Sequence, residues 1–142
     1  MNEEKYRHLT YDLTLHVAYT LSRMNDQMSF CYISGSGTDS SEKGRIMWAR
    51  VKGKTENSLM KLPFKNVYHF RPAVLSPTPG LKNTLTFYKY MGWLIPLLKV
   101  VMPNSVCSLQ QLGRAMINAV IDGYSTKVLE VRDIKLLANM QH

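Results

Sequence analysis

Two apolar segments joined by one helix-length segment constrain the fold of this chain more than any other feature. Residues 28–33 form a nearly continuous apolar run that ends in a Ser-Gly-Ser-Gly sequence, as is typical of a strand buried on both faces. Residues 38–61 begin with several oxygen-bearing N-cap candidates and have the length of a helix, and Pro63 follows its end. Residues 66–70 are rich in β-forming side chains and stop before Pro72. A strand, a helix and a strand with short connections form a βαβ unit, so we expect an α/β fold with parallel strands and a right-handed crossover.

Further helices and one strand are expected on both sides of this unit in the sequence. Residues 108–122 predict a helix with a serine N-cap, residues 127–131 a short strand, and residues 133–140 one or two helical turns. Residues 3–24 carry apolar side chains close to the helical period, and the buried stripe that this pattern predicts comprises Leu9, Leu13, Val17, Leu21 and Met24. With 142 residues, 45% of them hydrophobic, the chain is expected to form a single domain over residues 1–142, with flanking helices around a parallel sheet.

A proline-rich segment and an apolar segment follow the βαβ unit. Residues 72–80 contain three prolines and a glycine, which predict an irregular loop. Residues 81–102 are strongly apolar, but Pro96 and Lys99 interrupt them well before the roughly 18 uninterrupted apolar residues that a membrane-spanning helix needs. We therefore expect no transmembrane segment and interpret this region as core or partner contact, with contact to a membrane surface as the alternative.

The N-terminus, the cysteines and the histidines bear on compartment and metal binding. Residues 1–5 are charged and match neither a signal peptide nor a transit peptide, which favours a cytoplasmic protein. Cys31 and Cys107 lie far apart, with no CxxC and no nearby histidine pair, so we expect reduced thiols and no metal site. His8 and His16 lie two turns apart on a predicted helix, and we interpret them as surface or core residues rather than ligands.

A formal net charge of +8 raises the question of a polyanionic partner. The densest basic group lies on the helix predicted within the βαβ unit, where Glu42 and Glu56 dilute it; its members are Lys43, Arg45, Arg50, Lys52 and Lys54. We interpret this group as a solvated helix face. The alternative is a basic surface that binds phosphates or nucleic acid.

Common catalytic and nucleotide-binding motifs are incomplete or absent in the sequence. The turn Gly35-Ser36-Gly37 follows a predicted strand and precedes a predicted helix, which is the context of a phosphate-binding turn. A dinucleotide fingerprint requires a third glycine three residues later, and that position is Ser40. No Walker sequence, GxSxG elbow or HExxH motif occurs, so nothing supports a hydrolase or metalloprotease.

Three motifs nevertheless occur in an order and spacing that resemble a known family. Residues 32–37 read Tyr-Ile-Ser-Gly-Ser-Gly, Trp48 and Lys52 lie four positions apart on the predicted helix, and residues 70–72 read Phe-Arg-Pro. This arrangement resembles atypical short-chain dehydrogenases and NAD-dependent epimerases or dehydratases, which have an NAD(P)-binding Rossmann fold. In that family a strand ends in a catalytic serine, a helix carries Tyr-x-x-x-Lys, and the next strand ends in Arg-Pro. The resemblance covers nearly the whole chain.

The resemblance implies a role for each matching residue. Lys52 matches the lysine that lowers the pKa of the catalytic tyrosine and holds the nicotinamide ribose, and either Ser34 or Ser36 matches the serine that orients the substrate oxygen. Arg71 and Pro72 match the strand end beside the nicotinamide. Trp48 occupies the position of the catalytic tyrosine. An indole N–H can donate a hydrogen bond but does not exchange a proton near neutral pH, so ordinary dehydrogenase catalysis is not expected.

The resemblance also implies a partial Rossmann-like fold that lacks the N-terminal βαβ dinucleotide-binding half. On this view NAD or NADP and a small-molecule substrate bind when that half is supplied, and the exposed edge of the strand at residues 28–33 favours self-association. We therefore expect a truncated or remnant NAD(P)-binding, epimerase-like protein. One alternative is a non-enzymatic basic module that contacts protein, nucleic acid or a membrane surface. Another is an enzyme with unconventional chemistry around Trp48, Lys52 and Ser34. The sequence specifies neither the substrate nor the choice between NAD and NADP.

Overall fold

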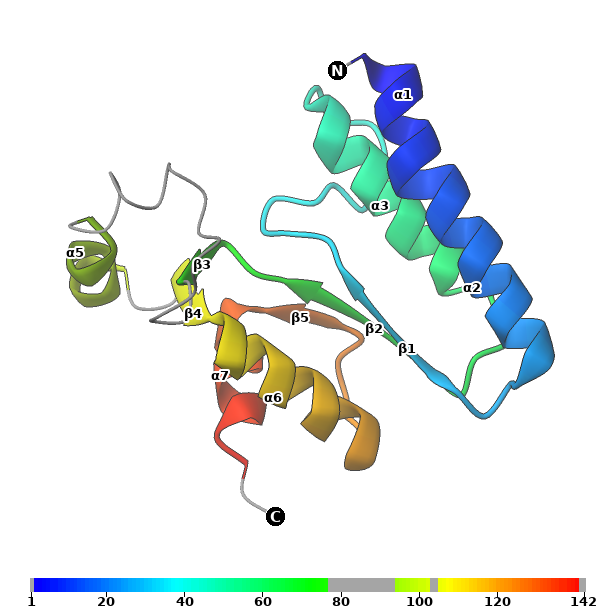
Figure 1. The fold of residues 1–142 in the computed structure, drawn as a ribbon. Coiled ribbons are helices and arrows are strands. Elements are labelled where there is room, and N and C mark those ends of the chain that lie inside the picture. The colour runs from blue at the N-terminus through cyan, green and yellow to red at the C-terminus, as the bar shows by residue number, and fades with distance from the viewer. Residues whose placement is uncertain (1, 77–93, 103–104, 141–142) are drawn as a thin grey trace, which may run out of the picture. The chain divides into compact units, whose positions relative to one another are not determined.

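The computed structural model describes residues 2–76, 94–102 and 105–140 (Figure 1). The chain divides into two compact units, Met1–Arg71 and Pro72–His142. Within them the expected mixed α/β architecture, with a small parallel sheet and flanking helices, is confirmed. Among the described residues, no helix combines the length and the apolar character needed to cross a membrane.

The first unit begins with one long helical rod. It consists of α1 (Glu3–Arg7), a π-helical segment η1 (His8–Asp12) and α2 (Leu13–Met24), and it confirms the helix predicted over residues 3–24. The predicted buried stripe is wrong, because four of its five members are 47–77% exposed: Leu9, Leu13, Val17 and Met24. The face that packs carries the small residues Ala18 and Ser22 instead. The wide turn of η1 breaks the regular period, and small side chains allow the helix to approach its neighbours closely.

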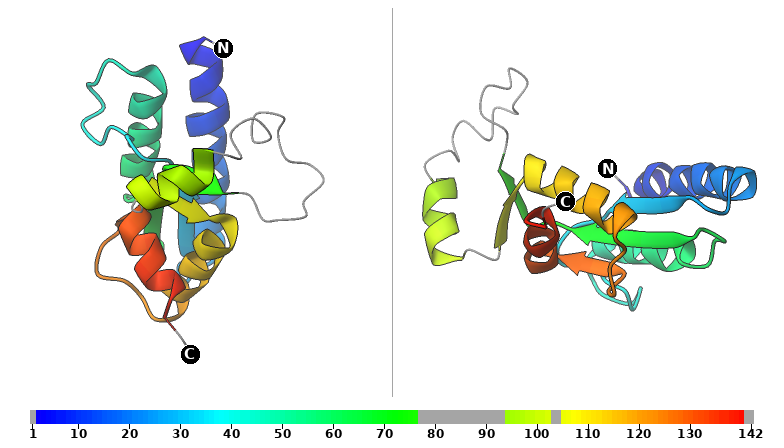
Figure 2. Two further views of the ribbon diagram at one scale, coloured as in Figure 1. Left: turned by 90° about the vertical axis from the view of Figure 1, so that its left-hand side faces the viewer. Right: turned by 90° about the horizontal axis from the view of Figure 1, so that it is seen from below.

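A βαβ unit completes the first unit, as predicted. β1 (Ser29–Ile33) and β2 (Asn66–Arg71) are parallel, with register from Ser29 opposite Asn66 to Ile33 opposite Phe70. α3 (Met47–Leu59) connects them and lies beside α2, as the views in Figures 1 and 2 show. Both helices cover the same face of the strand pair, where the core consists of Ala18, Leu59 and Val67, with Leu15, Phe30, Tyr32, Leu62 and Phe64 packed against it.

The loop before α3 explains why this helix starts later than predicted. The carboxylate of Asp39 accepts hydrogen bonds from the backbone N–H of Ser41 at 3.0 Å and from that of Gly44 at 2.6 Å. These bonds satisfy the backbone locally and compete with helix formation. The helix therefore begins at Met47 rather than at residue 38.

The same loop passes very close to the middle of α3. A Cβ atom added to Gly53 would lie 1.8 Å from the carbonyl oxygen of Asp39. Only a glycine at this position allows the loop to pass over the helix, because no real side chain tolerates that distance. This close approach, together with the hydrogen bond from the Asp39 backbone N–H to the Ala49 carbonyl oxygen at 3.1 Å, fixes the loop against α3.

In the second unit, two three-residue strands, β3 (Val74–Ser76) and β4 (Val106–Ser108), form a parallel pair. The irregular loop predicted over residues 72–80 is therefore wrong at residues 74–76, where pairing with β4 makes the chain a strand. α5 (Leu94–Val101) is the described part of the apolar segment, and Val100 and Val101 are exposed on it. The expectations for residues 77–93 lie outside the described residues.

The remaining elements of the second unit were predicted. They are α6 (Leu109–Ile121), β5 (Val128–Glu130) and α7 (Val131–Ala138). Ser108 caps α6 through a capping box with Gln111, which satisfies backbone donors at both positions. α6 and α7 pack together, and the Asn118 side chain donates a hydrogen bond to the Leu137 carbonyl oxygen at 2.8 Å.

Candidate functional site

A buried polar cluster lies where β1 and β2 end. Ser34 directly follows β1, Arg71 is the last residue of β2, and Glu56 projects from α3 and is only 2% exposed. Because both strands run in the same direction, their carboxyl ends meet at one edge, which is where ligands bind in open parallel sheets. The structure thus brings two of the predicted site residues together around a glutamate.

Glu56 organises this cluster. Its carboxylate accepts two hydrogen bonds from the Arg71 guanidinium, at 3.0 Å from Nε and 2.5 Å from Nη2, and one from the Ser34 hydroxyl at 2.5 Å. Arg71 Nη2 also donates to Ser40 Oγ at 2.7 Å. Two-pronged pairing of this kind fixes the orientation of both side chains. Ser34 and Arg71 are therefore engaged with the protein itself.

The sequence alone does not reveal the role of Glu56. In the sequence it stands only as an acid that dilutes a basic helix. Its position four residues after Lys52 and three before the buried Leu59 was the available signal, since these spacings share one helix face.

Lys52 reaches the same edge of the strand pair. Its ammonium donates a hydrogen bond to the Ser34 carbonyl oxygen, directly after the end of β1. The side chain is half-buried, and this burial lowers the pKa of Lys52, while the negative charge of Glu56 opposes the shift. An ammonium has three donors, and the hydrogen bond to Ser34 uses one of them, so donors are left for a ligand.

Trp48 lies beside the glycine turn one helical turn before Lys52. A Cβ atom added to Gly37 would be 3.7 Å from Trp48 Cη2, which places the indole against that turn. Gly35 and Gly37 have φ of 134° and 84°, so the turn needs glycine for its backbone conformation. Ser36 is exposed between them. Pro72, the remaining predicted site residue, is buried. It is the first residue of the second unit.

Two aromatic residues, Tyr32 and His69, lie opposite one another near the carboxyl ends of β1 and β2. His69 is 1% exposed, and neither of its ring nitrogens makes a hydrogen bond of normal geometry. Burial lowers the pKa of His69; the charge of Glu56 opposes this shift and that of Arg71 adds to it. Burial raises the pKa of Tyr32, whose ring meets His69 edge-on at 6.2 Å, to about 12. These environments keep His69 neutral and Tyr32 protonated near neutral pH, which suits packing rather than proton transfer.

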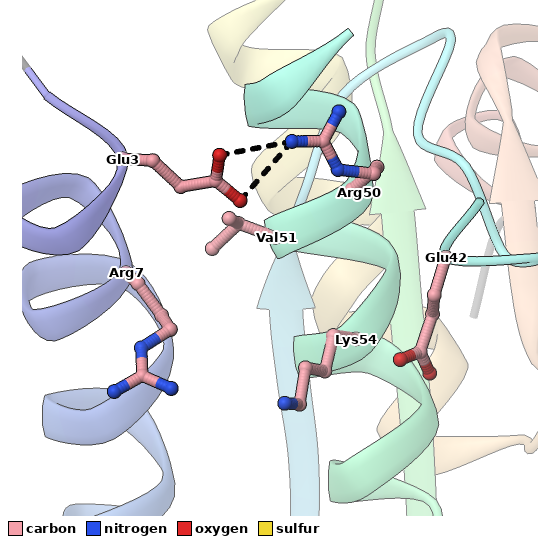
Figure 3. Close-up of a pocket in the computed structure, with 6 residues that line it drawn as sticks. All are labelled: Glu3, Arg7, Glu42, Arg50, Val51 and Lys54. Atoms are coloured by element: carbon pink, nitrogen blue, oxygen red, sulfur yellow. Dashed lines mark hydrogen bonds and ion pairs between the residues drawn. The ribbon is translucent and has the colours of Figure 1, made fainter. Parts of the chain in front are cut away.

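The five basic residues around α3 do not form one solvated face, so that interpretation is wrong. Lys43 and Arg45 are exposed before the helix begins. The Arg50 guanidinium pairs with an α1 carboxylate at 3.0 Å (Figure 3), Lys52 belongs to the site above, and the Lys54 ammonium lies 5.0 Å from the centre of a tyrosine ring. The five positive charges thus lie in different local environments and do not share one helix face.

The histidines and cysteines for which no metal site was predicted lie at separate places in the structure. His8 lies 3.6 Å from Asp12 on the helical rod, and His16 is exposed. Cys31 and Cys107 are free thiols, and burial raises the pKa of each. Within the described ranges, no three metal-ligating side chains cluster in a way that could hold an ion.

Comparison with known proteins gives no match to this chain, either among protein-family models or among curated proteins.

Proposed function

We propose that the first unit contacts the nicotinamide end of NAD or NADP and does so without ordinary dehydrogenase catalysis. The observation that carries this proposal is the position of Lys52, whose half-buried ammonium lies at the carboxyl end of β1. This position agrees with the family resemblance, in which the matching lysine holds the nicotinamide ribose. On this proposal the βαβ unit is part of a Rossmann-like fold.

The residues around Lys52 fit one edge of such a ligand. The glycine turn at residues 35–37 leaves backbone close to the strand end, and the Trp48 indole beside it offers an apolar face with a donor. In our proposal the Lys52 ammonium donates to ribose hydroxyls. Arg71 acts indirectly, because its guanidinium holds Glu56, which in turn fixes Ser34.

The same residues argue against the proton transfer that dehydrogenases of this kind perform. The Ser34 hydroxyl donates to the Glu56 carboxylate instead of facing a substrate oxygen. Trp48 cannot supply a proton near neutral pH. Bound dinucleotide would supply hydride chemistry, but neither Ser34 nor Trp48 would supply the accompanying proton. A binding or regulatory role therefore fits better than turnover.

NADH binding to the full chain tests the proposal. Quenching of tryptophan fluorescence is recorded as NADH is added, for the natural chain and for Lys52→Met. We expect saturable binding that weakens by about tenfold or more in the variant, since a hydrogen bond to a charged group is worth roughly 1.5–3 kcal/mol. Lys61→Met is the matched control, because Lys61 is exposed beyond the end of α3. Equal affinity of Lys52→Met and the natural chain would refute the proposal, and so would no binding at all.

The alternative of a basic binding module makes the opposite prediction. A chain that binds nucleic acid through its net charge loses affinity steeply as salt rises. The basic residues around α3 are dispersed over different surroundings, which gives such binding little support. Strong, salt-sensitive binding of a DNA or RNA oligonucleotide without NADH binding would favour this alternative.

A further inference from the structure

The helical rod and α3 match one another in steps of four residues. On the rod the steps are Glu3, Arg7 and Tyr11, and on α3 they are Arg50, Lys54 and Ser58. Glu3 pairs with Arg50 at 3.0 Å, and Tyr11 Oη lies 3.2 Å from Ser58 Oγ. Both pairs are 47 positions apart. The two helices therefore form a ladder whose outer rungs are complementary.

The middle rung of this ladder is not complementary. It has the same offset and places Arg7 opposite Lys54 (Figure 3). The Lys54 ammonium lies 5.0 Å from the centre of the Tyr11 ring, which holds it on the side of the rod. Over the described part of the chain, neither cation has a carboxylate within ion-pair distance. Arg7 and Lys54 thus face the same space, and neither of them is paired with a carboxylate of the described residues.

That space is a pocket of about 300 Å³. Its lining consists of the two cations, the Glu3–Arg50 pair, Val51 and Glu42. Figure 3 shows the Arg7 and Lys54 side chains on opposite sides of the gap between the rod and α3. The volume lies at the lower end of the range for small-molecule sites, so it suits one compact group.

We propose that this pocket binds a phosphate group through Arg7 and Lys54. A phosphate between them supplies the charge that the middle rung lacks. The arginine fork matches two phosphate oxygens, and the lysine acts as a point charge toward a third. This anion site is separate from the strand edge around Lys52, and it depends on neither the family resemblance nor nicotinamide binding.

The acids on the rim limit the ligand to a small molecule. Glu3 is engaged with Arg50, and Glu42 accepts a hydrogen bond from the Asn57 amide at 2.8 Å. Both carboxylates line the pocket, and each is held there by another side chain. A long polyanion such as nucleic acid would pass over them and be repelled, whereas a single phosphate group reaches the two cations between them.

Thermal unfolding of the full chain in sodium phosphate tests this proposal, with sodium chloride at matched ionic strength as the reference. A ligand that binds only the folded state raises the unfolding midpoint in a saturable way. We expect such a rise with inorganic phosphate. In Arg7→Gln and in Lys54→Gln the apparent dissociation constant weakens by about tenfold or more. Lys61→Gln, exposed and outside the pocket, keeps the full response.

A charge-reversal variant separates a site from a general salt effect. Arg7→Glu places a carboxylate opposite Lys54, so it should raise the midpoint without phosphate and abolish the phosphate response. Glycerol phosphate distinguishes the source of the group: a larger response than with inorganic phosphate indicates a phosphomonoester, and a smaller one indicates the free anion. An equal phosphate response in Arg7→Gln, Lys54→Gln and the natural chain overturns the proposal, as does no rise beyond the chloride reference.

Discussion

Removing Arg71 should destabilise the first unit more than removing any exposed arginine. In Arg71→Met the Glu56 carboxylate, whose side chain is 2% exposed, keeps only the Ser34 hydroxyl among the partners described above. Breaking a buried ion pair from one side costs about 3–5 kcal/mol. Because the Arg71 side chain is 12% exposed and water can replace part of it, we expect the lower end, about 3 kcal/mol.

Urea denaturation followed by tryptophan fluorescence measures this loss. The chain has two tryptophans, so all variants carry Trp93→Phe to make Trp48, in the first unit, the reporter. With a urea dependence of about 2 kcal/mol per molar, a loss of about 3 kcal/mol lowers the midpoint by about 1.5 M. Arg50→Met is the control, because its partner Glu3 is exposed and such pairs contribute at most about 1 kcal/mol.

A second substitution tests the assigned cause. Adding Glu56→Gln to Arg71→Met removes the uncompensated charge while keeping an oxygen acceptor for Ser34. The double variant should therefore recover part of the lost stability. Equal midpoint shifts for Arg71→Met and Arg50→Met, or a double variant no more stable than Arg71→Met, would refute the reasoning.

Three further predictions concern pH and packing, each measured as a change in the urea midpoint. Burial lowers the pKa of His69 below its usual 6.5, so as the pH falls the unfolded chain binds this proton before the folded chain does. Stability should therefore fall as the pH drops below about 6.5. His69→Leu should reduce this pH dependence, and an unchanged pH dependence would contradict the assignment. Gly53→Ala should cost at least about 2 kcal/mol through its backbone clash. Gly113→Ala, with open space around it, should gain up to about 1 kcal/mol, and because Gly113 lies in the second unit its unfolding is followed by circular dichroism. Similar effects of the two substitutions would contradict the close approach at Gly53. Leu15→Ala should cost about 1–2 kcal/mol and Leu13→Ala less than about 0.5 kcal/mol, and the reverse order would favour the stripe predicted from sequence.

The βαβ unit could be predicted because its signals are local. An apolar run, a helix-length segment and a β-forming run each identify themselves within a few residues. The start of α3 could not, since the Asp39 carboxylate satisfies the loop backbone and delays the helix to Met47. Which face of α2 is buried depends on how closely neighbouring elements approach it, and the spacing of apolar residues does not reveal this. The close approach leaves room only for small side chains, and Ala18 and Ser22 are the residues buried there.

Non-local pairing explains the other omissions. β3 and β4 are three residues each, and they pair across a long stretch of chain, so neither has a pattern of its own. Glu56 has the sequence context of a solvated glutamate and becomes buried only when the ends of β1 and β2 meet α3. The positions of Ser34, Lys52 and Arg71 at one edge were expected from the resemblance, but their mutual engagement was not.

The most direct test of the central proposal is a titration of the isotope-labelled chain with nicotinamide riboside, followed by amide and indole NMR signals. This ligand carries no phosphate, so it does not report on the pocket between the rod and α3. Contact at the strand edge predicts saturable shifts at the backbone amides of residues 35–37 and at the Trp48 indole N–H, and the loss of these shifts in Lys52→Met. Unchanged spectra, or shifts that persist in Lys52→Met, would contradict the proposal that this edge holds the nicotinamide end of a dinucleotide.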